Sequence, residues 1–562
     1  MTYTLGIDYG SNAVRIVALD YATGEIVVSA SQDYSDGEKG VLLDAHNVHL
    51  ARQNATDYVD SLCKCFEQLQ ERAKEKGVDL NHVKSIGVDA TGSTPIPVTK
   101  DLLPVSALEG FENNLSAKAW MWKDHTSEEE AKAITDVFRE NAPEFLKYCG
   151  GKYSSEWFWA KILKCLHTDE EVFDKAHTWV EFSDYIPAVL SGVKDADLVK
   201  RNVCAAGHKA LYVESLGGFP NRELIENIDP RLEKIRAGLP QKLSCADEVI
   251  GTLSKEWADR WGLNEDVKIA AGALDAHVGA IGSGVNQETL VKVVGTSSCD
   301  IIVGDKNLPD IQGISGIAQD SVIPGFNGIE AGQSAVGDIF KWYVEKHLKQ
   351  SPAYHGELTE KAAALRPGQS GLIALDWQNG NRNILLDANL TGMILGMSLY
   401  TEDHEVYRAL LEASAFGALK IIDRLEQSGV GIKKIICSGG IPQKNPLFMQ
   451  IFADVFNRTI YVSQNDENVA YGAAIIAAST LTDENGQRKS ILELQQQYIK
   501  ESSLVYEPIE SNVKLYKELY ALYSSLHDAF GSKEENGNMF EIMKKLLEIK
   551  KKAKPCTQEV AV

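Results

Sequence analysis

The sequence predicts an α/β fold made of two related domains. A strand, a glycine-hydroxyl turn and a second strand occur near the start of the chain, and the same pattern returns at residues 290–304. Between and after these copies, apolar runs of strand length alternate with segments of helical periodicity. A chain of 562 residues is also too long for one ordinary core. We therefore expect each domain to present one turn to a shared cleft.

The first copy is "GIDYGSNAVR". Residues 5–7 predict a buried strand and residues 14–19 a returning strand, because turn-forming residues interrupt the apolar runs there. A plain β-hairpin accounts for this stretch alone. The alternative is a phosphate-holding loop, in which Gly10 lets backbone N–H groups approach an anion and Asp8 faces a metal ion.

The remaining elements follow in chain order, as strands alternating with helices. Residues 85–98 predict a strand and a polar turn, residues 128–141 and 156–166 predict helices, residues 433–438 a strand, residues 446–457 an amphipathic helix, and residues 468–479 a helix whose small side chains permit close packing. The predicted domains are residues 1–284, residues 285–530 and a C-terminal helix and tail at 531–562, to which we assign no chemistry.

Composition and charge exclude several classes of function. The formal net charge is −22, from 57 basic and 79 acidic side chains, so we expect no nucleic acid and no membrane as partner. No apolar stretch reaches the roughly 20 residues that span a bilayer, and no leader is apparent, so a cytoplasmic protein is expected. The nine cysteines, and His46 and His49, lack the spacing of a zinc site.

Three motifs resemble the sugar-kinase, Hsp70 and actin superfamily, in which ATP lies between two ribonuclease-H-like domains. "GIDYGSNAVR" resembles its first phosphate loop, "VGTSSCD" the second and "CSGGIPQKN" the adenosine loop. Within this superfamily, "GGIPQKNPLFMQIFADVFN" and "GALDAHVGAIGSG" are similar to signatures of the FGGY carbohydrate kinases. Further motifs, including "GVDATGSTPIPV", "MWKDHT" and "GIEAGQSAVGD", resemble members that phosphorylate L-ribulose in arabinose catabolism.

The resemblance implies ATP and Mg²⁺ as cofactors, with Asp8 as the metal ligand. It also implies a nucleotide and phosphate site made of Gly10, Ser11, Asn12, Arg15, Gly295, Thr296, Ser297, Gly439, Gly440 and Asn445. The sugar site it implies contains Lys209, Glu330, Asp124, Trp122 and Thr94. Any one of these glycines is explained equally by a turn, and Asn445 before a proline is also a good helix N-cap.

Asp275 is the catalytic residue that the resemblance implies, as the base for the attacking hydroxyl. It follows an apolar run and precedes a small-residue helix, which places it at a strand end, where open α/β sheets bind ligands. From spacing alone, a helix N-cap is an equally good interpretation. In phosphoryl transfer the hydroxyl loses its proton late, so the carboxylate chiefly orients it.

The function expected from the resemblance is ATP-dependent phosphorylation of the terminal hydroxyl of L-ribulose to ribulose 5-phosphate. A kinase for another ketopentose or polyol, such as xylulose, D-ribulose or ribitol, is the alternative of the same class. An ATP-driven switch of the Hsp70 or actin type and a catalytically silent sugar-binding regulator are alternatives of other classes. The resemblance also implies a homodimer.

Overall fold

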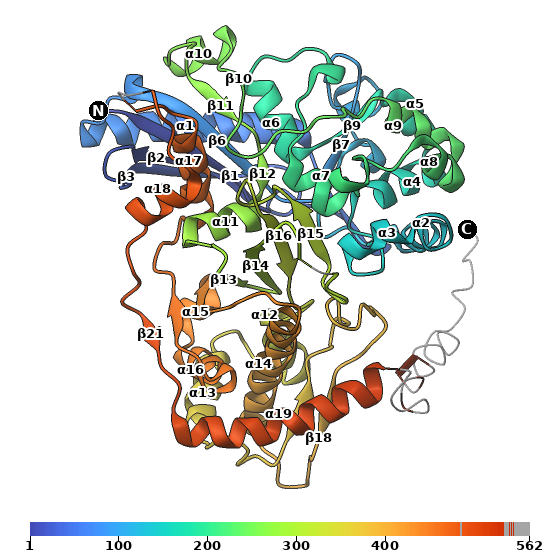
Figure 1. The fold of residues 1–562 in the computed structure, drawn as a ribbon, viewed down its shortest axis with the longest axis vertical. Helices are drawn as coiled ribbons and strands as arrows, with labels where there is room; N and C mark the ends of the chain where they lie inside the picture. The colour runs from blue at the N-terminus through green and yellow to red at the C-terminus, as the bar shows by residue number, and fades with distance from the viewer. Residues whose placement is uncertain (309, 484–485, 533–538, 540, 542, 545–562) are drawn as a thin grey trace. The chain divides into compact units, whose positions relative to one another are not determined.

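The computed structural model describes residues 1–562 except 309, 484–485, 533–538, 540, 542 and 545–562. The chain divides into two compact units (Figure 1). Unit 1 comprises residues 1–291, 301–330 and 465–501; unit 2 comprises residues 292–300, 331–464 and 502–562. Most of the predicted tail at 531–562 lies outside the described residues. Among the helices of the described residues, none has the length and apolar character that crossing a membrane requires.

The first sheet contains a parallel centre and an antiparallel edge. Its strand order is β10 (Val249–Thr252), β11 (Lys268–Ala270), β6 (Val83–Ala90), β1 (Tyr3–Tyr9), β2 (Ala13–Asp20) and β3 (Ile26–Asp33), and β12 (Ala273–Leu274) also pairs with β6. Strands β1, β2 and β3 form an antiparallel meander, whereas β6 is parallel to β1, β11 and β12. The predicted strand, turn and strand at the start of the chain are confirmed as β1 and β2.

The second sheet repeats the central strand order of the first. It runs β15 (Gly316–Gln319), β16 (Asn327–Ala331), β14 (Ser298–Gly304), β13 (Thr289–Val294), β19 (Lys434–Ser438), β20 (Ile460–Val462) and β21 (Val505–Tyr506). In each sheet the strand before the glycine turn (β1 or β13) lies between the strand after that turn (β2 or β14) and a later strand (β6 or β19), as in a ribonuclease-H-like fold. The internal repeat read from the sequence is thus a repeat of topology, and the α/β class is confirmed.

The smaller sheets and the helices complete the two units. The smaller sheets pair β4 (Leu42–Asp44) with β5 (Asn47–Gln53) and β5 with β8 (Ala119–Trp120), β7 (Pro95–Val98) with β9 (Thr178–Glu181), and β17 (Ile373–Leu375) with β18 (Met393–Leu395). The helices of unit 1 are α1 (Ala55–Lys76), α2 (Glu128–Asn141), α3 (Pro143–Leu146), α4 (Phe158–Thr168), α5 (Glu170–Lys175), α6 (Phe182–Leu190), α7 (Val203–Lys209), α8 (Arg222–Ile228), α9 (Glu233–Ala237), α10 (Lys255–Trp261), α11 (Asp275–Ser283), α17 (Asn468–Ser479) and α18 (Ile491–Tyr498). Those of unit 2 are α12 (Gly337–Lys341), α13 (Tyr354–Ala363), α14 (Asp403–Gln427), α15 (Gly440–Lys444), α16 (Pro446–Phe456) and α19 (Glu510–Gly531).

Helix α17 packs directly on β1, β6 and α11. A Cβ atom at Gly6 in β1 would lie 1.8 Å from the Ala470 carbonyl oxygen, and one at Gly472 would lie 2.0 Å from the Val278 carbonyl oxygen. Only glycine permits backbones to approach this closely. The small residues of 468–479 therefore serve the close packing predicted for them, and they attach this late segment to unit 1.

The predicted boundary at 284/285 does not coincide with the division into compact units. Residues 301–330 and 465–501 lie beyond that boundary, yet they belong to unit 1. The physical reason is non-local packing: α17, encoded almost 200 residues after the boundary, covers the first sheet. A domain boundary that is predicted from the order of the chain cannot take the packing of α17 on the first sheet into account.

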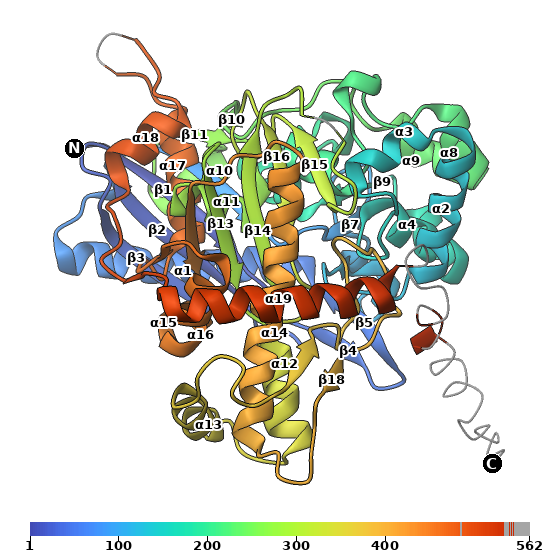
Figure 2. The same ribbon diagram turned by 60° about the horizontal axis from the view of Figure 1, so that its bottom comes forward.

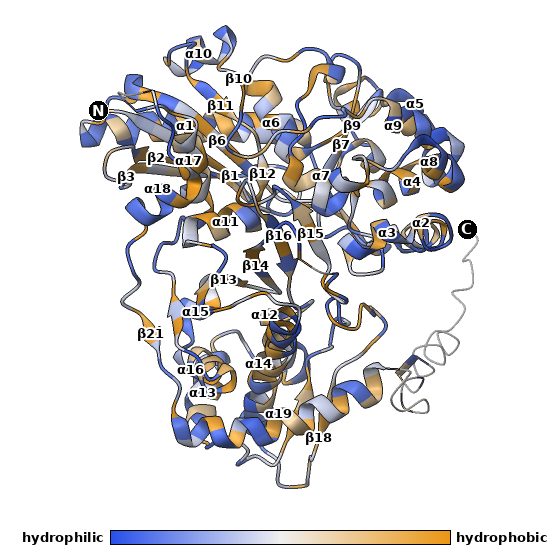
Figure 3. Ribbon diagram, in the orientation of Figure 1, coloured by the Kyte–Doolittle hydropathy of each residue, from blue (hydrophilic) through white to orange (hydrophobic). Residues whose placement is uncertain are grey.

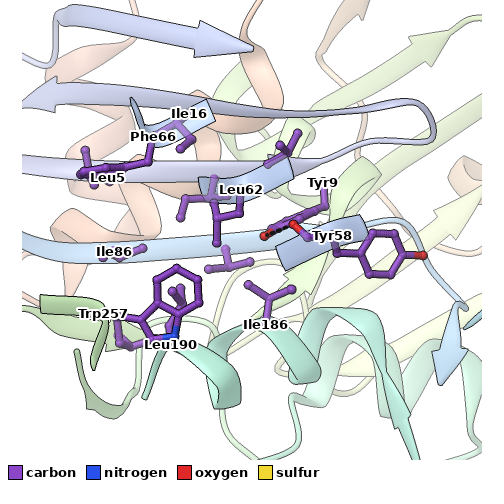
Figure 4. Packing of buried hydrophobic residues seen from close by; sticks show 14 of the residues in the cluster. Leu5, Tyr9, Ile16, Tyr58, Leu62, Phe66, Ile86, Ile186, Leu190 and Trp257 are labelled. Carbon is purple, nitrogen blue, oxygen red and sulfur yellow. Dashed lines mark hydrogen bonds between the residues drawn. The ribbon is translucent and has the colours of Figure 1, made fainter. Parts of the chain in front are cut away.

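An apolar core joins the first sheet to α1, α6 and α10. Leu5, Ile16 and Ile86 of the sheet meet Phe66 and Trp257 in this core, all nearly or completely buried (Figure 4). Aromatic stacking adds rigidity, because the rings of Tyr58 and Phe182 lie 3.7 Å apart and those of Phe66 and Trp261 4.2 Å apart. This core holds the carboxyl ends of β1 and β6 in fixed positions.

In unit 2, helix α14 is the central element and α19 crosses it (Figure 2). A buried network joins them: Arg408 Nε donates to Glu412 Oε1 at 2.8 Å, and the hydroxyl of Tyr516 lies 2.9 Å from the same oxygen. Along α19 hydrophobic and hydrophilic residues alternate (Figure 3), and its buried residues include Tyr516 and Tyr523. Such an amphipathic helix is typical of a surface element with one face on a core.

Candidate active site

Three aspartates converge at the carboxyl ends of the parallel strands of unit 1. Asp8 lies near the carboxyl end of β1, beside Asp89 of β6, and these two residues are direct partners in the parallel register. On the other side of β6, Ala273 of β12 pairs with Asp89, and two residues later Asp275 begins α11. Asp8 and Asp89 are buried. Open α/β sheets bind ligands at this edge.

Burial and mutual repulsion raise the pKa values of these carboxyl groups. Burial raises the pKa of Asp8 even though Arg15 Nη1 lies 2.8 Å from its Oδ2. The pKa of Asp89 is raised well above its usual value by burial and by the charges of Asp8 and Asp275. Burial, followed by the charge of Asp8, raises the pKa of Asp275 to about 7. Asp275 can therefore accept a proton near neutral pH.

Asp89 is a site residue that the sequence analysis did not predict, although it lies in the motif "GVDATGSTPIPV". Its position at the end of a buried strand, like that of Asp8, could have indicated it. What the motif could not show is that β6 lies between β1 and β12 in the sheet. That strand order brings Asp89 between two other acidic residues.

Lys209 and Glu330 meet as a buried ion pair. Lys209 is the last residue of α7, and its Nζ lies 3.0 Å from Oε1 and 2.8 Å from Oε2 of Glu330 in β16. Burial opposes ionisation of Glu330, but Lys209 and the neighbouring His277 and His208 outweigh it, so the pKa of Glu330 is far below its usual value. Both members of the pair also influence the pKa of Asp275, which places them in its electrostatic neighbourhood.

Asp124, by contrast, is committed to contacts within the protein. It is fully buried, accepts hydrogen bonds from the backbone N–H of Ala51 at 2.8 Å and from Thr126 Oγ1 at 2.5 Å, and pairs with Arg52. These donors explain why the residue is acidic and buried. The role of Asp124 as a sugar ligand stays a prediction.

Trp122 and Thr94 have partners in different elements. The indole Nε1 of Trp122 donates to Ser11 Oγ at 3.0 Å and so contacts the turn after β1. Thr94 is buried, and its backbone N–H donates to Glu181 Oε2 at 2.8 Å. Trp122 thus borders the turn that carries the predicted phosphate-binding residues.

The turn between β1 and β2 is held by backbone and side-chain contacts. The N–H of Gly10 donates to the Ala13 carbonyl at 3.0 Å, Gln53 Nε2 donates to the Ser11 carbonyl at 2.9 Å, and Asn12 Nδ2 donates to the Lys39 carbonyl at 2.6 Å. These bonds shape the turn, in which Asn12 is exposed and Gly10 and Ser11 are half-buried.

In unit 2, two glycine turns lie side by side. Gly295 and Thr296 are exposed, and their carbonyls accept from the backbone N–H groups of Gly337 at 3.0 Å and Asp338 at 3.1 Å. A Cβ atom at Gly439, whose φ is +107°, would lie 2.4 Å from the Val294 carbonyl oxygen. The turn at 295–297 and the turn at 439–440 are therefore neighbours within this unit.

Asn445 occupies the position that the N-cap interpretation predicted. Its side-chain oxygen accepts from the N–H of Phe448 at 3.0 Å, and Pro446 follows it as the first residue of α16. This bond satisfies one of the donors that a helix start leaves open. The cap role does not depend on a ligand.

Comparisons with known proteins cover nearly the whole chain. Residues 3–282 match the N-terminal domain and residues 290–481 the C-terminal domain of the FGGY family of carbohydrate kinases. A ribulokinase from Halalkalibacterium halodurans is 38% identical over 545 residues, which is 94% of this chain and 95% of that protein. A ribulokinase from Shouchella clausii is 38% identical over 572 residues, or 98% of each chain.

A solved structure shares the fold at lower identity. The crystal structure of a xylulose kinase from Rhodospirillum rubrum superimposes with a TM-score of 0.75 at 19% sequence identity, and the match covers 94% of this chain and 98% of that one. At this identity the likeness concerns the fold alone.

Proposed function

The chain belongs to the FGGY family of carbohydrate kinases, and on this premise we propose that it transfers the γ-phosphoryl group of ATP to the terminal hydroxyl of L-ribulose. The products are ribulose 5-phosphate and ADP. The observation that carries the proposal is Asp275, with a pKa raised to about 7, beside the buried Lys209–Glu330 pair. The full-length similarity to proteins named ribulokinase supports the choice of sugar.

Asp275 is proposed to act on the attacking hydroxyl. In phosphoryl transfer through a loose transition state, the hydroxyl becomes acidic late, so the base first accepts a hydrogen bond and then the proton. A carboxylate with a pKa near 7 holds that proton better than an ordinary aspartate does. Lys209 and Glu330 offer a donor and an acceptor to adjacent sugar hydroxyls, an arrangement that suits polyols.

The nucleotide is proposed to contact the three glycine turns. Glycine lets the backbone of these turns come close to an anion: a Cβ atom at Gly439 would lie 2.4 Å from the Val294 carbonyl oxygen and one at Gly10 3.0 Å from Arg15 Nη1, whereas one at Gly295 would meet nothing within 4 Å. Asp8 fits a Mg²⁺ ligand, because Mg²⁺ prefers carboxylate oxygens, and the buried aspartates leave negative charge that Arg15 alone does not balance. Mg²⁺ bound there would neutralise charge on the triphosphate.

The cellular setting is proposed from the family resemblance. We place the enzyme in the cytoplasm, as part of arabinose catabolism, and as a homodimer. The negative net charge of −22 supports a protein that does not bind nucleic acid.

The test is coupled detection of ADP with a panel of sugars: L-ribulose, D-ribulose, xylulose and ribitol. We expect L-ribulose to give the highest kcat/KM, and Asp275→Asn to lower kcat by at least a hundredfold while ATP still binds. Asp266→Asn, an exposed aspartate of the same unit, is the matched control and should keep wild-type rates. ADP release that is independent of every sugar would refute a kinase and favour an ATP-driven switch. Preference for another sugar would refute the choice of substrate alone.

A further inference from the structure

Two buried histidines lie close to Glu330 Oε2, the carboxylate oxygen that also lies 2.8 Å from Lys209 Nζ. His208 Nδ1 lies 3.7 Å and His277 Nε2 3.5 Å from Glu330 Oε2. The three residues come from α7, α11 and β16, and each offers one ligand atom within 4.8 Å of the other two. The two imidazole rings lie against each other, with centroids 4.4 Å apart.

The hydrogen bonds around His208 indicate which of its nitrogens carries the proton. The hydroxyl of Ser321 donates to the Ala318 carbonyl at 3.0 Å, so its hydrogen is already used. His208 Nε2, which lies 2.8 Å from that hydroxyl oxygen, must therefore be the donor in this contact. A neutral imidazole has only one N–H, which leaves a lone pair on Nδ1, directed at the Glu330 side of the ring.

His208 and His277 are both buried, and each carries ring nitrogens that are shielded from solvent. Among the residues that the structure describes, none forms a hydrogen bond with His208 Nδ1 or with either ring nitrogen of His277. Buried polar atoms without partners are rare in proteins, so a bound group is expected where they converge.

We propose that His208 Nδ1, His277 Nε2 and Glu330 Oε2 bind a divalent transition metal ion of the zinc class. Ligand atoms at about 2.0–2.2 Å from a tetrahedral Zn²⁺ lie about 3.3–3.5 Å from one another. The observed separations from Glu330 Oε2, 3.5 and 3.7 Å, are within a few tenths of an ångström of that spacing. Two imidazoles and one carboxylate form a donor set that suits Zn²⁺ or Co²⁺ and disfavours Mg²⁺, which takes oxygen ligands.

The surroundings of the three ligands support the same assignment. Metal-bound histidines usually donate their second N–H to a neighbouring acceptor, as His208 does to Ser321. Metal-bound carboxylates are usually hydrogen-bonded as well, and Lys209 Nζ lies 3.0 Å from the second oxygen, Oε1.

Lys209 also limits the affinity of the site. Its ammonium lies 2.8 Å from Oε2, the oxygen that would bind the metal, so it repels a cation there. The metal and Lys209 thus compete for one carboxylate oxygen. Removing the charge of Lys209 should tighten metal binding, whereas a purely structural role of the two histidines predicts no such effect.

The test is titration of the purified, metal-free full chain with Co²⁺ in the presence of excess Mg²⁺ and without ATP or sugar. Visible d–d absorption reports Co²⁺ bound to nitrogen and oxygen ligands, and the measurement does not depend on kinase activity. We expect one equivalent per chain, at least tenfold weaker binding in His277→Phe and in Glu330→Gln, and tighter binding in Lys209→Met. His167→Ala, a half-exposed histidine that also faces a glutamate, is the matched control and should bind like the wild type.

Circular dichroism of each variant checks the fold, and Glu330→Gln, which preserves size, keeps the test decisive if His277→Phe does not fold. The proposal is overturned if Co²⁺ gives no such absorption, if Glu330→Gln binds as the wild type does, or if His167→Ala abolishes the signal. Failure here leaves the proposed kinase reaction intact, because the assay contains neither of its substrates.

Discussion

Lys209→Met should destabilise unit 1 in a pH-dependent manner. In the wild type, the Lys209 ammonium lies 2.8 and 3.0 Å from the two carboxylate oxygens of Glu330, and both side chains are largely buried. Without the ammonium, His277 Nε2 at 3.5 Å and His208 Nδ1 at 3.7 Å remain beside Glu330 Oε2, and burial lowers the pKa of both imidazoles. A buried carboxylate without a positive partner either remains charged at a high cost or takes up a proton.

The cost of taking up that proton sets the size of the effect. A glutamate with an ordinary pKa near 4.3 needs about 3.7 kcal/mol to be protonated at pH 7, and about 1 kcal/mol at pH 5. In the wild type the pKa of Glu330 is lowered, so the stability it contributes is present above its unfolded pKa and is lost only as pH falls toward the folded value. The variant should therefore lose about 3–4 kcal/mol at pH 7 and only about 1 kcal/mol at pH 5.

Urea unfolding followed by tryptophan fluorescence at the two pH values measures this difference. Most tryptophans belong to unit 1, so the signal reports mainly on that unit. Lys209→Met/Glu330→Gln should recover most of the loss, because it removes the unpaired charge. Lys84→Met, which breaks an exposed pair with Asp266 at 3.4 Å, is the control and should change stability by about 0.5 kcal/mol or less. A loss under about 1 kcal/mol at pH 7, or an equal loss at both pH values, would refute the reasoning.

Two further predictions concern the proposed base and the glycine turn of unit 2. Because the pKa of Asp275 is raised to about 7, kcat/KM for the sugar should rise with pH and should be about one tenth of its plateau at pH 6; a profile that is flat from pH 5 to 8 would contradict this role. Gly439→Ala should weaken ATP binding by at least tenfold, because its φ is +107° and its Cβ would lie 2.4 Å from the Val294 carbonyl. Gly431→Ala, at a glycine of the same unit with nothing within 4 Å of its Cβ, is the control, to be compared by calorimetric titration with ATP.

Local patterns in the sequence were sufficient to predict the secondary structure around the site. The strand and turn at residues 5–11, the helix at 128–141 and the helix at 468–479 all lie where periodicity and turn residues predicted them. The second predicted helix, 156–166, is shifted by two residues and is α4 (Phe158–Thr168). These features depend on neighbours within a few residues, which a single sequence records directly.

The partner of each buried polar residue was not predictable in this way. The sequence could not show that Asp124 pairs with Arg52, 72 residues earlier. Asp89 was overlooked, because only the strand order puts it between Asp8 and Asp275. The cluster of His208, His277 and Glu330 has no sequence spacing that a metal motif would match.

By itself, then, the sequence determined the alternating strands and helices, the repeated glycine turns and the family to which the chain belongs. The tertiary structure alone decided that Asp8 and Asp89 are neighbours at the same edge of the sheet and that Lys209 pairs with Glu330. It also decided that residues 465–501 belong to unit 1. The physical reason is the distance along the chain over which each kind of interaction acts. Backbone preference and hydrophobic periodicity act over a few residues, whereas the pKa of a carboxyl group and the occupancy of its lone pairs depend on groups brought together by folding.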